Sequence, residues 1–303
     1  MAWSTRWVDF DGAMLAPAVA HPSLDVKTVQ SAEMSLAQGG MLEADETGCY
    51  FVPIDDSGHE TGAEKAFDNL GCRALSRFGS KWSFLWGQDG GGGELIVFDD
   101  QSVAVHSLQL QPLQYVWDRV VFADGSFLVS AFWEDEQTAK YINWLTWFDD
   151  SGKVLSPSIA VPNAVDPDFD SAPVLVARAG DHAMAAWQST NVSALPIEED
   201  GQPLSLTVQT VTTDAPIYEL SLFTQPNGDV MVVWMVLDEQ TNDFSLHARV
   251  IAPDGTPRGP ATLLSNDVTS FQVHGAVEST NARALLTFVT KDGTIEALPL
   301  TCQ

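Results

Sequence analysis

The chain has 303 residues, of which 45% are hydrophobic and 18% are charged, which suits one large or two ordinary folded domains and argues against disorder. Lys and Arg number 14 against 41 Asp and Glu, so the formal net charge is −27 at pH 7. Such a charge repels nucleic acid and anionic lipid, and neither is an expected partner. The longest apolar run, Val230 to Leu237, is far too short to span a bilayer, so membrane insertion is not expected.

Short apolar runs that end near an aromatic residue recur along the chain. In order they are GGMLEA, SKWSFLW, GSFLVSAFW, GDHAMAAW, GDVMVVW and NARALLTF. The residues at their shared last position are Ala44, Trp86, Trp133, Trp187, Trp234 and Phe288, spaced 42 to 54 residues apart. Repetition at one position predicts that these aromatic side chains pack between neighbouring structural units, whereas stacking on sugars would require them to be exposed.

Each run is flanked by two further extended segments. An extended segment such as QYVWDRVVFADG precedes a run, and segments such as INWLTWFDDSG and ARVIAPDG follow one and end in Asp-Gly turns. One unit therefore consists of four strands in about 40–50 residues, which predicts an all-β fold, a β-propeller with four-stranded antiparallel blades. Two β-sandwiches are the rival fold, but the long period argues against them.

Six runs predict six blades in one domain, although the irregular first and fourth units leave five or seven open. The expected blades cover about residues 23–70, 71–111, 112–162, 163–214, 215–266 and 267–303. The last unit has three predicted strands. We expect residues 1–22 to supply its outer strand and close the ring, because Arg6 to Pro22 (RWVDFDGAMLAPAVAHP) resembles Trp147 to Pro162 (WFDDSGKVLSPSIAVP). Closure would remove an exposed sheet edge.

The sequence is less clear about the secondary structure of two segments and about the pairing of the cysteines. Residues 26–37 fit either a helix or a strand, and we expect a strand because the repeat requires one; residues 60–70 are expected to form a short helix. The cysteines are Cys49, Cys72 and Cys302, too few for a disulfide-rich or zinc-binding domain. A Cys49–Cys72 disulfide is the preferred pairing in an exported protein, and three buried thiols are the alternative.

One unit carries a further motif. Val232-Val233-Trp234, Arg249 and the run Asp254-Gly255-Thr256-Pro257-Arg258-Gly259 resemble the repeats of large secreted or surface β-propeller proteins of bacteria. The resemblance implies export and a binding or adhesive role more than catalysis. The N-terminal residues MAWSTRWVDFDG contain no signal peptide, so the sequence by itself leaves a cytoplasmic location open.

Charged residues fall on the first predicted strand of most blades, the strand that lines the central tunnel of a propeller. The candidates for a tunnel site are Glu33, Arg73, Asp118, Arg119, Arg178, Glu219 and His274. They predict an axial pocket for a small anionic ligand held by Arg donors. Internal salt bridges are the alternative. Side-chain alternation should decide which residues face the tunnel, and the sequence does not reveal it.

Acidic residues follow the second predicted strand of most blades and should gather on one face of the ring. They are Asp45, Glu46, Asp89, Glu134, Asp135, Glu136, Asp238, Glu239 and Asp292. Such a face would attract cations or a basic partner, and solvated loop charge is the alternative.

Asp166, Asp168 and Asp170 stand at alternate positions of one loop. Carboxylate oxygens in this arrangement predict a Ca²⁺ site, the one metal cofactor we expect. The Gly and Glu that complete an EF-hand loop are absent, so a polar loop without metal is the alternative.

The chain contains no GxSxG, HExxH, Walker or dinucleotide-binding motif. The expected function is therefore non-enzymatic: a monomeric, exported or cell-surface module that binds a small polar or anionic ligand, a glycan or a protein through the acidic loops or the tunnel. A hydrolase or lyase acting on carbohydrate or another small polar substrate at the tunnel mouth is one alternative. A structural module of a larger assembly is another.

Overall fold

The computed structural model describes most of the chain, and every regular element in that part is a β-strand. The described residues are 3–5, 19–21, 28–35, 38–44, 48–55, 59–61, 65–67, 72–78, 81–87, 93–99, 106–110, 115–122, 124–135, 140–161, 174–188, 191–198, 208–212, 217–269, 274–277 and 283–301. The all-β prediction is confirmed. Over these residues we find no helix of the length and apolarity needed to cross a membrane.

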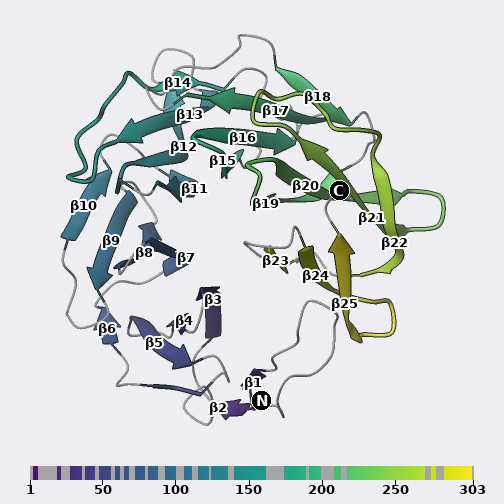
Figure 1. Ribbon diagram of the computed structural model, residues 1–303, viewed down its shortest axis with the longest axis horizontal. Helices are drawn as coiled ribbons and strands as arrows, with labels where there is room; N and C mark the ends of the chain where they lie inside the picture. Colours follow the sequence, from purple (N-terminus) through teal and green to yellow (C-terminus); the bar gives the residue numbers. More distant parts are fainter. Residues whose placement is uncertain are drawn as a thin grey trace.

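Within the described residues, six antiparallel sheets of three or four strands follow one another along the chain and are arranged around a common centre in sequence order (Figure 1). The first contains β3 (Thr28–Ser35), β4 (Gln38–Ala44), β5 (Cys49–Asp55) and β6 (Lys65–Phe67). The second contains β7 (Cys72–Phe78), β8 (Lys81–Gly87), β9 (Gly93–Asp99) and β10 (His106–Leu110). The third contains β11 (Tyr115–Val121), β12 (Phe127–Asp135), β13 (Lys140–Phe148) and β14 (Ile159–Ala160).

The remaining sheets repeat this plan. The fourth contains β15 (Val174–Ala179), β16 (His182–Gln188), β17 (Val192–Ile197) and β18 (Gln209–Thr212). The fifth contains β19 (Ile217–Thr224), β20 (Val230–Asp238), β21 (Asp243–Ile251) and β22 (Thr262–Val268). The sixth contains β23 (His274–Val277), β24 (Arg283–Val289) and β25 (Ile295–Thr301).

The first strand of each sheet is the innermost one. Contacts join β3 to β7, β7 to β11, β11 to β15, β15 to β19 and β19 to β23, so the first strands neighbour one another around the centre. The strand expected within residues 26–37 is confirmed as β3. The helix expected within residues 60–70 is wrong: β6 lies there and pairs Phe67 with Cys49 of β5. Pairing with a sheet edge outweighs a weak local helix preference.

The N-terminal strands β1 (Trp3–Thr5) and β2 (Val19–His21) form a hairpin. Ser4 pairs with Ala20, just as Trp144 of β13 pairs with Ala160 of β14, so each residue has a counterpart 140 positions later. The hairpin thus matches the third and fourth strands of a sheet. It lies between the first and sixth sheets in the view of Figure 1. Within the described residues β25 pairs only with β24, so the expected pairing of the N-terminal segment with the last sheet is not observed there.

The hydrophobic core lies between adjacent sheets. Trp187 packs with Leu145 and Trp147 between the third and fourth sheets, Trp234 lies between the fourth and fifth, and Phe288 lies between the fifth and sixth. These three repeated aromatics are 0%, 1% and 2% exposed, which confirms the predicted packing between units for them. The side chains at positions 44, 86 and 133 lie outside the described part.

A disulfide joins the first two sheets. Cys49 of β5 bonds to Cys72 of β7 across a Cα–Cα distance of 6.0 Å, and both residues are buried. The preferred pairing is therefore confirmed. Cys302 lies outside the described residues.

Candidate binding site

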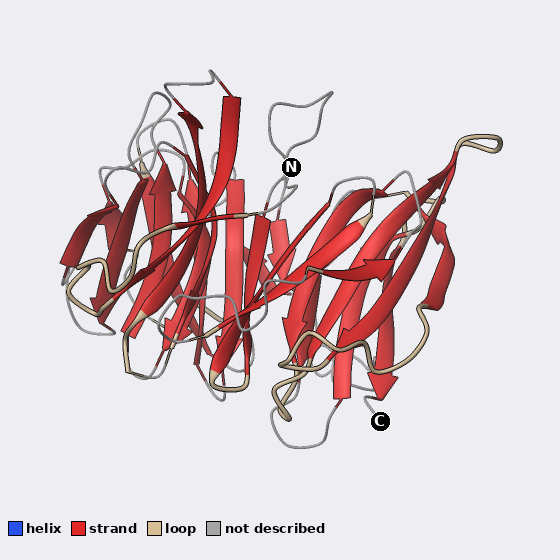
Figure 2. Cartoon of the chain, turned by 90° about the horizontal axis from the view of Figure 1, so that it is seen from above, coloured by secondary structure: helices blue, strands red, loops and turns tan. Residues whose placement is uncertain are grey.

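Alternating strand directions give the arrangement of sheets two distinct faces, which Figure 2 shows from the side. In every sheet the first strand begins, and the second ends, on one face, which we call the loop face. The opposite face, where the first strand turns into the second, we call the turn face. The fourth strand of one sheet ends, and the first strand of the next begins, on the loop face, as β10 and β11 do.

The predicted tunnel residues all lie on first strands, as expected. Glu33 is on β3, Arg73 on β7, Asp118 and Arg119 on β11, Arg178 on β15, Glu219 on β19 and His274 on β23. The side chains of Glu33, Arg73 and His274 are outside the described part. Arg178 is exposed, and its Nε donates to the carbonyl of Gly180 in the adjoining turn at 2.9 Å. Ligand binding by this set remains a prediction.

Asp118 and Arg119 point to opposite neighbours. Asp118 Oδ2 accepts a 2.9 Å hydrogen bond from the backbone N–H of Val176, in the following sheet. Arg119 Nη2 donates to the carbonyl and the hydroxyl of Ser83, in the preceding sheet, at 2.6 and 2.9 Å. Successive side chains of this first strand, which lies next to the common centre, therefore point toward two different neighbouring sheets. Both charged groups thus reach neighbouring sheets, and which first-strand residues face the tunnel stays a prediction.

Polar side chains of one sheet also form hydrogen bonds with backbone groups on the first strand of a neighbouring sheet. Ser130 Oγ donates to the carbonyl of Val174 at 2.5 Å, and Thr224 Oγ1 donates to the carbonyl of Arg178 at 2.7 Å. A first strand has a paired strand on one side only, and its backbone groups on the other side need partners. Polar residues near the centre thus have a structural role that the sequence alone does not distinguish from ligand binding.

Two first strands carry an aromatic residue in a β-bulge near the loop face. Trp117 is the extra residue between Val116 and Asp118 in β11, and Tyr218 is the extra residue between Ile217 and Glu219 in β19. Bulges redirect side chains and are frequent beside functional sites. Sequence reasoning missed both residues, although Trp117-Asp118 and Tyr218-Glu219 share the order aromatic then acid.

The two aromatics have different surroundings. Trp117 stacks on Phe132 with ring centres 4.7 Å apart, and its Nε1 donates to Asn143 Oδ1 at 2.9 Å. Tyr218 is 43% exposed and meets Phe244 edge to face at 5.4 Å. Tyr218 is thus the more accessible of the two.

The predicted acidic loop residues have several outcomes. Asp238 and Glu239 are exposed at the β20–β21 hairpin, and Asp292 is exposed at the β24–β25 turn, all on the loop face. Glu134 and Asp135 belong to β12 and Asp238 is the last residue of β20, because strand pairing continues through all three, so their assignment to a loop is wrong. Asp45, Glu46, Asp89 and Glu136 lie outside the described residues.

Many acids cap tight turns. The segments 122–126, 149–153, 252–256 and 290–294 each have a backbone hydrogen bond from their first residue to the carbonyl of their fifth, with a glycine of positive φ at the fourth position. The aspartate of the turn accepts from a backbone N–H two residues later, as Asp124 does from Ser126 at 3.0 Å and Asp254 from Thr256 at 2.9 Å. These four aspartates, Asp124, Asp149, Asp254 and Asp292, therefore have a structural role in their turns.

These hydrogen bonds also change the acidity of the turns. A hydrogen bond from the Ser126 hydroxyl holds the pKa of Asp124 below its ordinary value, and one from Ser151 does the same for Asp149. The pKa of Asp254 is lowered chiefly by a hydrogen bond from the backbone N–H of Thr256, and that of Asp292 chiefly by one from the Thr290 hydroxyl. The charged form is favoured because it is the stronger acceptor.

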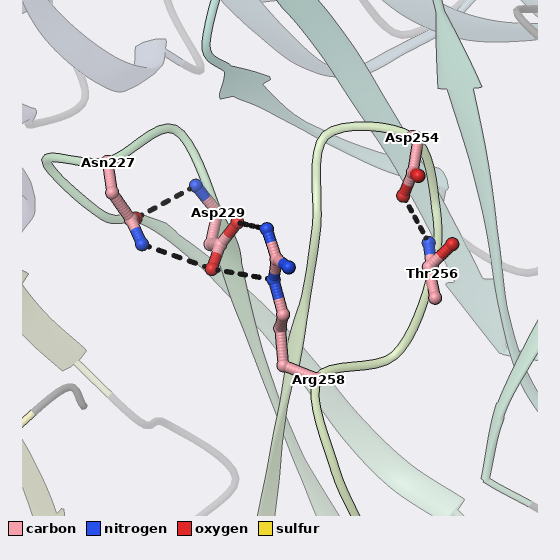
Figure 3. Close-up of polar contacts among 5 residues, drawn as sticks. All are labelled: Asn227, Asp229, Asp254, Thr256 and Arg258. Carbon is pink, nitrogen blue, oxygen red and sulfur yellow. Dashed lines mark hydrogen bonds and ion pairs between the residues drawn. The ribbon is translucent and has the colours of Figure 1, made fainter.

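Arg258 and Asp229 form a two-point ion pair on the turn face (Figure 3). Arg258 Nε and Nη2 each lie 3.2 Å from a carboxylate oxygen of Asp229, which is 5% exposed, and Asn227 Nδ2 donates to Oδ2 of the same carboxylate. The hydrogen bond and the charge of Asp229 raise the pKa of Arg258 above its ordinary value. Forked contacts of this kind fix geometry as well as charge.

Arg249 of the recognised motif has a similar structural role. Its Nε donates to the carbonyl of Gly259 at 2.6 Å, and its Nη1 donates to the carbonyl of Val211 in β18. The motif therefore ties the fifth sheet to the fourth.

The predicted calcium ligands Asp166, Asp168 and Asp170 lie outside the described residues. Within the described residues no group of three or more His, Cys, Asp or Glu side chains is arranged to hold a metal ion.

No protein-family model matches the sequence, and no curated protein matches it either. Solved structures do match the fold. The "Dos1 propeller" superposes with a TM-score of 0.54 at 12% identity, over 99% of this chain and 74% of that one. The propeller domain of the trilobed protease from Pyrococcus furiosus, described as having an open velcro topology, gives 0.53 at 10% identity over 91% and 83% of the two chains.

A third similar structure is a larger protein. The acylaminoacyl peptidase of Pyrococcus horikoshii gives a TM-score of 0.57 at 9% identity over 92% of this chain. The match spans only 45% of that peptidase. Together with the four-stranded antiparallel sheets, these similarities define a β-propeller scaffold; identities this low concern the fold alone.

Proposed function

We propose that this protein is a non-enzymatic binding module that takes a ligand or protein partner on its loop face, around Tyr218 and Trp117. The observation that supports this most directly is the pair of bulges that place an aromatic residue at the start of two axial strands. Tyr218 is 43% exposed beside an acidic hairpin. A large aromatic side chain at an exposed, preformed position is typical of binding surfaces.

We favour the loop face over the axial pocket. Asp118 and Arg119 use their charged groups to join neighbouring sheets, and a ligand would have to compete with those contacts. An axial site formed by Glu33, Arg73 and His274 together with Arg178 and Glu219 remains the second location that we propose to examine.

Differential capture tests the proposed function. Wild-type protein, Tyr218→Ala and Leu263→Ala would be immobilised and exposed to extract from the native source and to a glycan array. Leu263 is the matched control, because it is 50% exposed on the outer strand β22. We expect a stoichiometric partner or a glycan that the wild type and Leu263→Ala retain and Tyr218→Ala loses. Equal capture by all three proteins would refute the proposal.

Export and a monomeric state are part of the proposal. The Cys49–Cys72 disulfide supports export, because disulfides persist in oxidising compartments. We further propose six blades in a ring that the N-terminal hairpin helps to close, which a seam between β25 and the hairpin would permit.

A non-catalytic module within a larger assembly is the second candidate. It is favoured by the similarity to the peptidase, because the match covers nearly all of this chain but less than half of the peptidase chain. Co-purification of a larger complex whose assembly is insensitive to Tyr218→Ala would favour this candidate. Turnover of chromogenic glycosides would instead favour the hydrolase or lyase alternative.

A further inference from the structure

Tyr218 lies at the base of an acidic hairpin. Phe244, its edge-to-face partner, pairs with Leu237, and the next pair along the ladder is Asp238 with Asp243. All residues from Asp238 to Asp243 are exposed, while Phe244 is half-buried. The aromatic pair and the hairpin acids therefore share one small region of the loop face in the fifth sheet.

The hairpin carries more negative than positive charge. Asp243 pairs with Lys291 of the sixth sheet at 2.8 Å, and this hydrogen bond lowers the pKa of Asp243, which keeps it ionised. Asp238 Oδ1 accepts from the backbone N–H of Gln240 at 2.9 Å. Glu239 forms no ion pair with any described residue. Two carboxylates, those of Asp238 and Glu239, thus lie at the tip of the hairpin whose Phe244 contacts Tyr218, and neither forms an ion pair with a described residue.

We infer that this region binds a Lys or Arg side chain from a basic peptide segment of a protein partner. The inference rests on the proposed function and names the class of partner. An aromatic face attracts a cation, and nearby carboxylates supply a counter-charge. The net charge of −27 adds a long-range attraction for basic segments and repels acidic ones. A neutral glycan offers hydroxyl donors to the carboxylates, but only a cationic group is attracted by their charge, so the charge favours a cationic partner.

Peptide binding tests the inference. A fluorescently labelled oligo-arginine peptide would be titrated at low and moderate salt, with Gly-Ser and oligo-glutamate peptides for comparison. The variants are Tyr218→Ala, Tyr218→Phe and the double change Asp238→Asn/Glu239→Gln. The matched control is Asp150→Asn/Asp181→Asn, which removes the same charge from exposed turn-face positions. Thermal melts would establish that each variant is folded.

We expect Tyr218→Ala to weaken oligo-arginine binding about two- to fivefold, as for an exposed cation–aromatic contact, and Tyr218→Phe to bind like the wild type. The Asp238→Asn/Glu239→Gln variant should bind more weakly than the turn-face control. Equal weakening by the two double variants would overturn the inference, because binding would then follow net charge alone. Tyr218-dependent binding on the glycan array without peptide binding would also overturn it, while leaving the proposed function intact.

Discussion

Arg119 of β11 donates two hydrogen bonds to Ser83 of β8 and so joins the third sheet to the second. Arg119 is 6% exposed and Ser83 is fully buried. The guanidinium group is thus removed from water and donates hydrogen bonds to a carbonyl and a hydroxyl. This buried arginine therefore has a structural role in joining two sheets.

Replacing this arginine should therefore be costly. We expect Arg119→Met to lower the free energy of unfolding by about 2–4 kcal/mol, because the buried Ser83 groups lose their partner. The exposed Arg178, also on an axial strand, provides the control, and Arg178→Met should change stability by less than about 1 kcal/mol. Urea unfolding measures both, and equal losses would contradict the structural role of Arg119.

Gly228 allows a test of the contact between neighbouring turns. Its φ is +84°, and a Cβ there would lie 2.8 Å from Cα and N of Gly180 in the fourth sheet. Gly293 has a φ of +82° but has no atom within 4 Å of its Cβ position. Gly293→Ala should cost about 1–2 kcal/mol from the left-handed backbone alone, and Gly228→Ala should cost more. Similar urea midpoints for the two variants would show that the turns can separate freely.

The turn aspartates predict a loss of stability in acid. Asp124 has a lowered pKa in the folded protein, chiefly because of the Ser126 hydroxyl, so its stabilising effect is present above about pH 4, near the unfolded value, and is lost as the pH falls through the folded value. Asn occupies the equivalent turn position at Asn227, where Oδ1 accepts from Asp229 N–H. Asp124→Asn should therefore fold but lose less stability than the wild type between pH 4 and pH 2. Parallel pH profiles in urea unfolding would rule this out.

The disulfide should stabilise the first two sheets. Cys49 and Cys72 are 23 positions apart, and closing a loop of this size typically adds about 3 kcal/mol. Reduction should lower the melting temperature of the wild type, whereas a Cys49→Ala/Cys72→Ala variant should melt at one temperature with or without reductant. Thiol titration would verify reduction, and an unchanged melt of fully reduced protein would contradict the prediction.

Calcium binding by Asp166, Asp168 and Asp170 remains a separate prediction. If the loop binds Ca²⁺, the melting temperature should be several degrees higher with Ca²⁺ than with chelator, since ligation stabilises the folded state. A variant with Asn at all three positions should lose that difference. Identical wild-type melts under the two conditions would count against the site.

The sequence predicts some candidate residues well and others poorly, for reasons that particular positions make clear. Trp187 and Trp234 recur with the period of the repeat, so their burial between sheets follows from periodicity. Trp117 and Tyr218 do not, because a bulge depends on the pairing of two strands and leaves little local signal. The turn aspartates look like surface charge in the sequence, and only the backbone geometry reveals the N–H groups that they accept from.

Repeated strands and turns in the sequence determine the all-β fold and the placement of Glu33, Asp118, Arg178 and the other candidates on axial strands, because alternating hydrophobicity and Asp-Gly turns are local properties. The tertiary structure decides where each charged group goes. Asp118 and Arg119 are adjacent in the chain, yet one reaches Val176 and the other Ser83, because successive side chains of a strand point to opposite sheets that lie far apart in the sequence.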